Sequence, residues 1–205
     1  SAASDVYKRQ FFNGASGTDY TVPKEQFEQN NKLMASSGVG YISYFHTFNS
    51  DGSLHPNSTR MIGGTGQPYV TGAWKGDYWL FEVPVKNFKS GTKVRFTGLT
   101  RISGTGQKYW SLQYMDGTSW KPATDTQTAT VNGEQITYTH LVPTANMQID
   151  VTMTFARGIS DGSVKIRFYC EANTTGGTEP NGGTIRWASS ADNGYNDSPV
   201  IQVVE

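Results

Sequence analysis

Residues 147–155 read MQIDVTMTF, and this stretch decides the fold class because apolar and polar side chains alternate along its whole length. Alternation with a period of two places every apolar side chain on one face of a β-strand and every polar one on the other. Antiparallel sheets with one face in a core and one face in water show this pattern. The apolar set is Met147, Ile149, Val151, Met153 and Phe155.

Similar segments recur from about residue 40 to the C-terminus, separated by turn-forming pairs such as Asp116-Gly117, Asn132-Gly133 and Asp161-Gly162. About ten short strands without helical periodicity between them predict an all-β fold, an antiparallel β-sandwich of jelly-roll type. At most one short helix is expected, over residues 23–34. The residues predicted to be mostly buried between the two sheets are Val94, Phe96, Trp110, Leu112, Ile149, Val151, Met153, Ile166 and Phe168.

The first ten residues, SAASDVYKRQ, differ in character from the rest of the chain. They resemble an adapter-derived translation at the end of an assembled sequence fragment, so we interpret residues 1–10 as non-native. Residues 11–205 show no linker or composition break after Gly40, which predicts a single β-sandwich domain. If this interpretation is right, the native N-terminus is missing, and the lack of a signal peptide does not indicate where the protein is located.

Composition narrows the classes of partner. The 205 residues include 17 Lys and Arg and 17 Asp and Glu, and this zero net charge argues against a nucleic-acid partner. No stretch approaches the roughly 20 apolar residues of a membrane-spanning helix. The single cysteine, Cys170, is in phase with apolar Ile166 and Phe168 and is predicted to be a small buried hydrophobe. Nothing in the pattern indicates an oligomeric state.

No catalytic motif and no metal site is predicted. His46, His55 and His140 lie on separate segments without the spacing of metal ligands, and no cofactor is expected. A structural calcium ion stays open as an alternative, because jelly-roll modules often hold one through loop carboxylates. The loop carboxylates in question are Asp51, Asp77, Asp116, Asp161, Asp192 and Asp197.

Glycoside hydrolysis would need two carboxyl groups that face each other across a cleft. Glu82 and Glu171 fall on predicted strands, but nothing in the sequence pairs them with each other or with nearby aspartates, and the E-x-D-x-x-E pattern of sandwich-fold glucanases is absent. The simpler interpretation is that they are solvated. The nearby aspartates are Asp77, Asp116 and Asp150.

Four cations fall in the outward phase of two predicted strands: Lys93, Arg95, Lys165 and Arg167. If those strands were neighbours, the four charges would share one surface that could hold an acidic sugar or a protein partner. The simpler interpretation is a solvated face that keeps the sheet soluble.

Four aromatic residues fall in or beside predicted loops: Trp74, Trp120, Trp187 and Tyr195. Loops at one end of a sandwich are where ligand sites are commonly built. A flat aromatic ring can stack on the apolar face of a sugar while amides and carboxylates bind the hydroxyl groups. These four residues are therefore the predicted ligand-binding residues, with packing at the open end of the core as the alternative.

Two stretches carry a resemblance to a known family. Residues 76–120 contain GDYWLF and the hairpin WSLQYMDGTSW, and the C-terminal part contains KIRFYCEAN and SPVI. Together they resemble the jelly-roll domains, with galactose-binding-like folds, of Bacteroidetes cell-surface and secreted proteins, often lipoproteins. The resemblance covers about three fifths of the chain. It implies a glycan-binding or cell-surface accessory module, although many such domains have no assigned function.

The sequence therefore predicts a non-catalytic, extracellular or cell-surface module that binds carbohydrate or acts in adhesion, with a glycan as the expected partner. The resemblance also implies a lipid anchor. The anchoring cysteine expected near the start is absent from this sequence, so the anchor stays an expectation. Two alternatives stay open, a glycan-degrading enzyme domain with a sandwich fold and a purely structural spacer. Facing carboxyl groups in a groove would favour the enzyme, and a shallow aromatic patch would favour binding.

Overall fold

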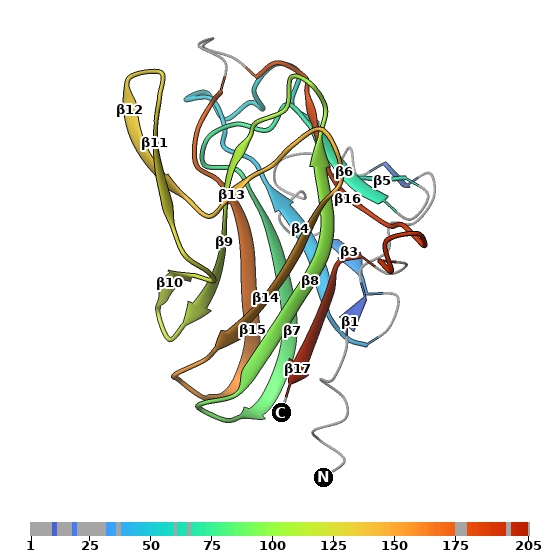
Figure 1. The fold of residues 1–205 in the computed structure, drawn as a ribbon, viewed down its shortest axis with the longest axis vertical. Coiled ribbons are helices and arrows are strands. Elements are labelled where there is room, and N and C mark those ends of the chain that lie inside the picture. The colour runs from blue at the N-terminus through green and yellow to red at the C-terminus, as the bar shows by residue number, and fades with distance from the viewer. Residues whose placement is uncertain are drawn as a thin grey trace.

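The computed structural model describes residues 10–11, 18–19, 32–35, 38–59, 61–64, 67–174, 180–195 and 198–204. Within these ranges the chain forms seventeen β-strands and no helix. Two sheets with antiparallel pairing throughout enclose one core, and a separate hairpin projects beside them (Figure 1). The predicted antiparallel β-sandwich of jelly-roll type is confirmed. The strand number exceeds the expected ten because several strands span only two or three residues, too few to show a period.

Sheet A has the strand order β1-β17-β8-β16-β6-β5-β2, and β14 pairs with the other side of β8. Its members are β1 (Gln10–Phe11), β2 (Thr18–Asp19), β5 (Ile62–Gly64), β6 (Gln67–Thr71), β8 (Lys93–Ile102), β14 (Met147–Thr154), β16 (Thr184–Ala188) and β17 (Val200–Val204).

Sheet B has the order β10-β9-β15-β7-β4-β3, and the short β13 pairs with β9. Its members are β3 (Lys32–Met34), β4 (Tyr41–Phe45), β7 (Tyr78–Phe88), β9 (Tyr109–Asp116), β10 (Ser119–Pro122), β13 (His140–Leu141) and β15 (Ile159–Cys170). The separate hairpin consists of β11 (Gln127–Val131) and β12 (Glu134–Tyr138). Long strands alternate between the sheets along the chain, from β7 in sheet B to β8 in sheet A and back to β9.

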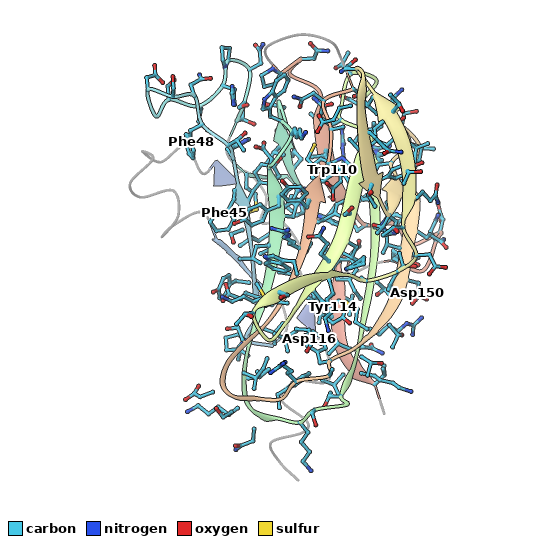
Figure 2. The ribbon with its side chains drawn as sticks, turned by 90° about the vertical axis from the view of Figure 1, so that its left-hand side faces the viewer. Phe45, Phe48, Trp110, Tyr114, Asp116 and Asp150 are labelled. Atoms are coloured by element: carbon cyan, nitrogen blue, oxygen red, sulfur yellow. The ribbon has the colours of Figure 1, made fainter. Side chains whose placement is uncertain are left out.

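The core lies between the sheets and follows the predicted phase. Eight of the nine predicted residues are buried, and Val151 is partly buried and packs against them. Figure 2 shows Trp110 inside the sandwich and Asp150 on its outer side. Each fully buried Val, Leu, Ile, Met or Phe side chain contributes about 1.5–3 kcal/mol of transfer free energy. Cys170 is buried as predicted, and burial raises the pKa of its thiol well above the usual value.

Two of the three predicted turns are confirmed. Asp116 pairs with Ser119 across the β9–β10 turn, and Asn132 and Gly133 join β11 to β12 with positive φ angles of 51° and 82°. The positive angles are those of a type I′ hairpin turn. The third prediction is wrong, because Asp161 and Gly162 lie inside β15, opposite Lys86 and Val85 of β7. The long partner strand β7 supplies hydrogen bonds there, so the chain turns earlier, at residues 155–158.

Two further predictions concern the N-terminal region. The predicted helix over residues 23–34 is wrong at its end, because Lys32–Met34 is a strand that pairs with β4. Residues 23–31 lie outside the described residues, as do residues 1–9. Gln10 pairs with Ile201 in the β1–β17 ladder, and the division between residues 1–10 and 11–205 stays a prediction.

The hypothesis of one shared cationic face is wrong. Lys93 and Arg95 lie on β8 in sheet A, whereas Lys165 and Arg167 lie on β15 in sheet B. The two pairs point outward from opposite sheets and cannot act on one ligand. Arg95 instead forms an ion pair with Asp150, 2.5 Å from nitrogen to oxygen.

Candidate functional site

A row of aromatic side chains crosses the outer face of sheet B. In the strand registers Tyr169 of β15 lies opposite Tyr78 of β7, and Tyr78 lies opposite Phe45 of β4. The rings of Phe45 and Tyr78 are stacked with centroids 4.9 Å apart, and those of Tyr78 and Tyr169 are stacked at 6.4 Å. All three side chains are half-buried. We call these three residues the aromatic row.

Arg167 lies beside the aromatic row on the same face. Its Nε atom donates a hydrogen bond to Oε1 of Gln113 on β9, at 2.7 Å. Its guanidinium carbon lies 4.5 Å from the ring centre of Tyr169, 5.6 Å from that of Tyr78 and 4.4 Å from that of Trp120 on β10. These are cation–π distances, so Arg167 joins Trp120 to the aromatic row. Burial is the main reason that the pKa of Arg167 is lowered.

A cavity of about 350 Å³ adjoins this cluster. Its floor includes Ser111 and Gln113, which point outward from β9, and Glu171, which follows β15. Its other lining residues come from the loop before β7, the end of β10 and the β11–β12 hairpin: Lys75, Pro122, Thr126, Glu134, Gln135, Ile136 and Thr137. Side chains that can form hydrogen bonds therefore line the cavity on several sides.

The β11–β12 hairpin is held in place by a small apolar cluster of its own. Ile136, Tyr138 and Ala172 are buried together, and Tyr109 of β9 packs against them. The rings of Tyr109 and Tyr138 meet edge to face at 4.9 Å. This contact anchors the hairpin to the outer side of β9, which makes one wall of the cavity (the hairpin is at the upper left of Figure 1).

Two of the charged residues that line the cavity form an ion pair with each other. Nζ of Lys75 lies 2.5 Å from Oε1 of Glu134, so the loop before β7 is tied to the hairpin. Burial raises the pKa of Glu171, while a hydrogen bond from Ser111 opposes this shift. Glu171 therefore keeps its proton to a higher pH than an exposed glutamate does.

Glu82 and Glu171 are not a catalytic pair. Glu82 lies opposite Lys165 in the β7–β15 ladder. Lys165 is six residues before Glu171, and a strand spans roughly 20 Å over that length. The two carboxyl groups of glycosidases lie within about 5–9.5 Å of each other. Glu82 is instead bonded by the hydroxyl group of Tyr41 and lies 3.5 Å from Nζ of Lys165.

The structure does not bring the four predicted ligand residues together. Trp187 lies in β16 and is fully buried, with ring centroids 5.3 Å from Phe81 and 5.4 Å from Phe168. The prediction for Trp187 is wrong, because a ring enclosed by the core cannot contact a ligand. A Cβ atom at Gly98 would lie 2.8 Å from this indole, so the missing side chain makes room for it.

The other three predicted residues occupy separate places. Trp74 is half-buried in the loop before β7, with its ring centroid 5.6 Å from that of His55. Tyr195 forms an isolated bridge with Ser190 in the loop after β16. Trp120 lies in β10 rather than in a loop and belongs to the cluster around Arg167. A ligand role for these three residues stays a prediction.

The aromatic row was missed because strand residues were interpreted as core. Tyr169 lies in phase with Lys165 and Arg167, and Tyr78 lies in phase with Glu82. An aromatic residue in the polar phase of a strand is an outward-facing ring, and this signal is present in the sequence. Two outward tyrosines on neighbouring strands would have indicated the face.

The loop aspartate Asp77 serves the fold. Its side chain is fully buried and accepts hydrogen bonds from the backbone nitrogen atoms of Thr47 at 2.7 Å and Trp74 at 3.0 Å. The hydroxyl groups of Thr47 and Tyr44 also donate to it, and Nδ1 of His46 lies at 2.8 Å. These groups use the carboxylate oxygens that a cation would need.

Across the described ranges no group of three or more His, Cys, Asp or Glu side chains could hold a metal ion. Asp197 lies outside those ranges, and the calcium alternative is untested. Among the residues that the structure describes, no helix has the length and apolar character needed to cross a membrane.

No protein-family model matches the chain, and no curated protein matches it. Among solved structures, one described as CBM4 has 10% sequence identity, covers 80% of this chain and 94% of its own, and has a TM-score of 0.43. The CBM22-1 xylan-binding domain from Paenibacillus barcinonensis Xyn10C has 10% identity, covers 96% and 93%, and has a TM-score of 0.40.

The family 11 carbohydrate-binding module from Clostridium thermocellum, in complex with a mixed-linked tetrasaccharide, has 10% identity, covers 96% of both chains and has a TM-score of 0.31. With such identities and scores, the ligands of those proteins say nothing about the ligand of this chain. Its function is therefore argued from its own residues.

Proposed function

We propose that this chain is a non-catalytic carbohydrate-binding module of a bacterial surface or secreted protein, and that it binds glycan on the outer face of sheet B. The observation that carries the proposal is the aromatic row beside Trp120, half-buried on an outward sheet face and next to a cavity with polar walls. Outward sheet faces are ordinarily polar, and grouped aromatic rings there mark an interaction site.

The chemistry of the face suits a sugar. A pyranose ring presents an apolar face that can pack on aromatic side chains, and Tyr78 and Tyr169 offer two half-buried aromatic side chains next to each other on this face. Around them Ser111, Gln113 and Glu171 offer donors and acceptors to sugar hydroxyl groups. Rings with few rotatable bonds give this contact at small entropic cost.

The test is binding of the full chain to a glycan array, followed by calorimetry with the best ligand. Replacing Tyr169 with Ala should lower affinity about tenfold or more, because the ring stack is lost while the buried core is untouched. Tyr195→Ala is the matched control, since Tyr195 lies beside Arg95 and Asp150 of sheet A. Loss of affinity in the control alone would favour the loop site predicted from sequence, and no binding to any glycan would favour a structural spacer.

One observation favours glycoside hydrolysis as a second candidate. Glu134 of the hairpin and Glu171, which follows β15, line the same cavity, and the pKa of Glu171 is raised as that of a general acid must be. Against this, Glu134 is tied to Lys75 in an ion pair. Release of reducing ends from a bound glycan, abolished in Glu171→Gln, would establish the enzyme. Binding without release supports the module.

A further inference from the structure

Arg167 occupies the middle of the outer face of sheet B and is fixed in orientation. Its neighbours across the strand ladders are Gln113 on one side and Leu80 on the other. The hydrogen bond from Nε to Gln113 uses one edge of the guanidinium group, and the ring of Trp120 lies against it. A guanidinium held in this way keeps its fork of N–H donors pointing in one direction.

The charge of Arg167 is not neutralised by an acid. Among the described residues no carboxylate lies within ion-pair distance of it, and its terminal NH₂ groups have no hydrogen-bond partner. Glu171 acts on Arg167 through space without contact, and burial raises the pKa of Glu171 itself. Four of the other cations in the described ranges have acidic partners within 4 Å: Lys75, Arg95, Lys121 and Lys165.

The lack of an acidic partner matters because the side chain of Arg167 is partly buried. A half-buried guanidinium has lost part of its hydration, as the lowered pKa of Arg167 reflects. Hydrogen bonds from such a group to an anion are short, strong and often bidentate. The free donors lie beside the aromatic row, where a stacked sugar would place the substituents of its ring edge.

We propose that the glycan bound on this face carries an anionic group, the carboxylate of a uronic acid or a sulfate, and that Arg167 binds that group. The inference rests on the proposed function and adds the ligand class to it. The sugar ring packs against the aromatic row beside Tyr169, and its anionic substituent accepts hydrogen bonds from the terminal NH₂ groups of Arg167. Lys165 lies two residues before Arg167 on the same face, but its charge is paired with Glu82, so Arg167 is the cation of this face that is left for an anion.

The experiment measures binding of the full chain to matched pairs of polymers by calorimetry at low salt and at high salt. Polygalacturonate is compared with its methyl ester, in which the carboxylates are capped, and dextran sulfate is compared with dextran. The anionic member of at least one pair should bind about tenfold more tightly than its neutral form. The pair that shows this difference assigns the anion as carboxylate or sulfate.

The variants R167Q and R95Q remove one charge each from opposite sheets. R167Q should remove the preference for the anionic polymer, and R95Q should keep it, with melting temperatures measured for both. If R167Q melts early, R167K replaces it, with R95K as its control. R167K keeps the charge without the planar fork, and it should lose at least about threefold in affinity for the anionic polymer.

Two outcomes separate this inference from the proposed function. Equal binding of anionic and neutral members, with affinity lost in Tyr169→Ala, would overturn the inference and leave a neutral glycan as the ligand. No binding to any polymer here or on the glycan array would overturn both. A preference for the anionic polymer that is as large in R167Q as in the wild type, or an affinity for it that is unchanged in R167K, would also overturn the assignment to Arg167.

Discussion

Nδ1 of His46 lies 2.8 Å from Oδ2 of Asp77, and both side chains are fully buried. The other ring nitrogen of His46 lies 2.5 Å from the carbonyl oxygen of Thr59, so both nitrogen atoms of the imidazole face acceptors. Asp77 in turn accepts from the backbone of Thr47 and Trp74. One carboxylate therefore ties β4 and the loop that follows it to the loop before β7, which also carries Lys75.

Replacing Asp77 with Asn should lower the free energy of unfolding by about 3 kcal/mol or more, because a buried donor replaces an acceptor that several N–H and O–H groups address. Urea denaturation at neutral pH measures the change. Asp150→Asn is the control, since the ion pair of Asp150 with Arg95 is exposed and should be worth at most about 1 kcal/mol. Equal losses in the two variants would contradict a structural role for the buried carboxylate.

Ile166 tests the core. It is fully buried in the middle of β15, opposite Phe81 of β7 and Tyr114 of β9. Truncation to Ala should cost about 2–5 kcal/mol through lost burial and the cavity left behind. Thr152→Ala, on the exposed face of β14, should change stability by less than about 0.5 kcal/mol. A cost for Ile166→Ala as small as that of the control would show that the sheets do not pack as described.

His140 makes stability depend on pH. Burial lowers its pKa to about 4, from an ordinary value of 6.5 in the unfolded chain. Between these values the unfolded state binds the proton and the folded state does not, so acid favours unfolding. The stabilising contribution is complete above about pH 6.5 and is lost as the pH falls toward 4.

The measurement is the free energy of unfolding of the wild type and His140→Gln at several pH values from 7.5 to 4.5. The wild type should lose stability more steeply, with a difference of up to about one proton in the linkage slope. Because the carboxylates titrate in both proteins, the difference between the curves isolates His140. Parallel curves would show that the imidazole is protonated as easily in the folded state as in the unfolded chain.

The phase of the long strands was predictable from the sequence, whereas one turn and the shortest strands were not. Alternation predicted the phase of Val94, Phe96 and Ile166 correctly, because burial of one strand face imposes it. The turn at Asp161-Gly162 was wrong because a turn signal is local, whereas continuation of β15 depends on the distant partner β7. Strands of two or three residues, such as β13, show no period and exist because β9 is adjacent.

The candidate site was harder to predict for a related reason. Trp120 was found because a large ring near a turn stands out, but Tyr78 and Tyr169 come together only through the β7–β15 register. Trp187 shows the opposite error, since its place in the sequence near a polar loop concealed its contacts with Phe81 and Phe96. Which strands neighbour each other is set by the topology, and alternation within one strand carries no information about it.

Trp120 and Trp187 are the same residue type in opposite environments, and they give the last prediction. Trp187→Ala removes a fully buried ring from the core and should cost about 3–5 kcal/mol of stability. Trp120→Ala removes a half-buried ring from the outer face of sheet B and should cost much less, while glycan affinity falls about tenfold because the support of Arg167 is lost.

Chemical denaturation and calorimetry with the ligand found on the array measure both quantities for each variant. A temperature at which both variants stay folded keeps the affinities comparable. Under those conditions Trp187→Ala should bind like the wild type, because its ring does not reach the surface. If Trp120→Ala instead melts early and keeps its affinity in the folded state, Trp120 is a packing residue of the β9–β10 hairpin. The binding face would then be limited to Tyr78, Tyr169 and the cavity beside Glu171.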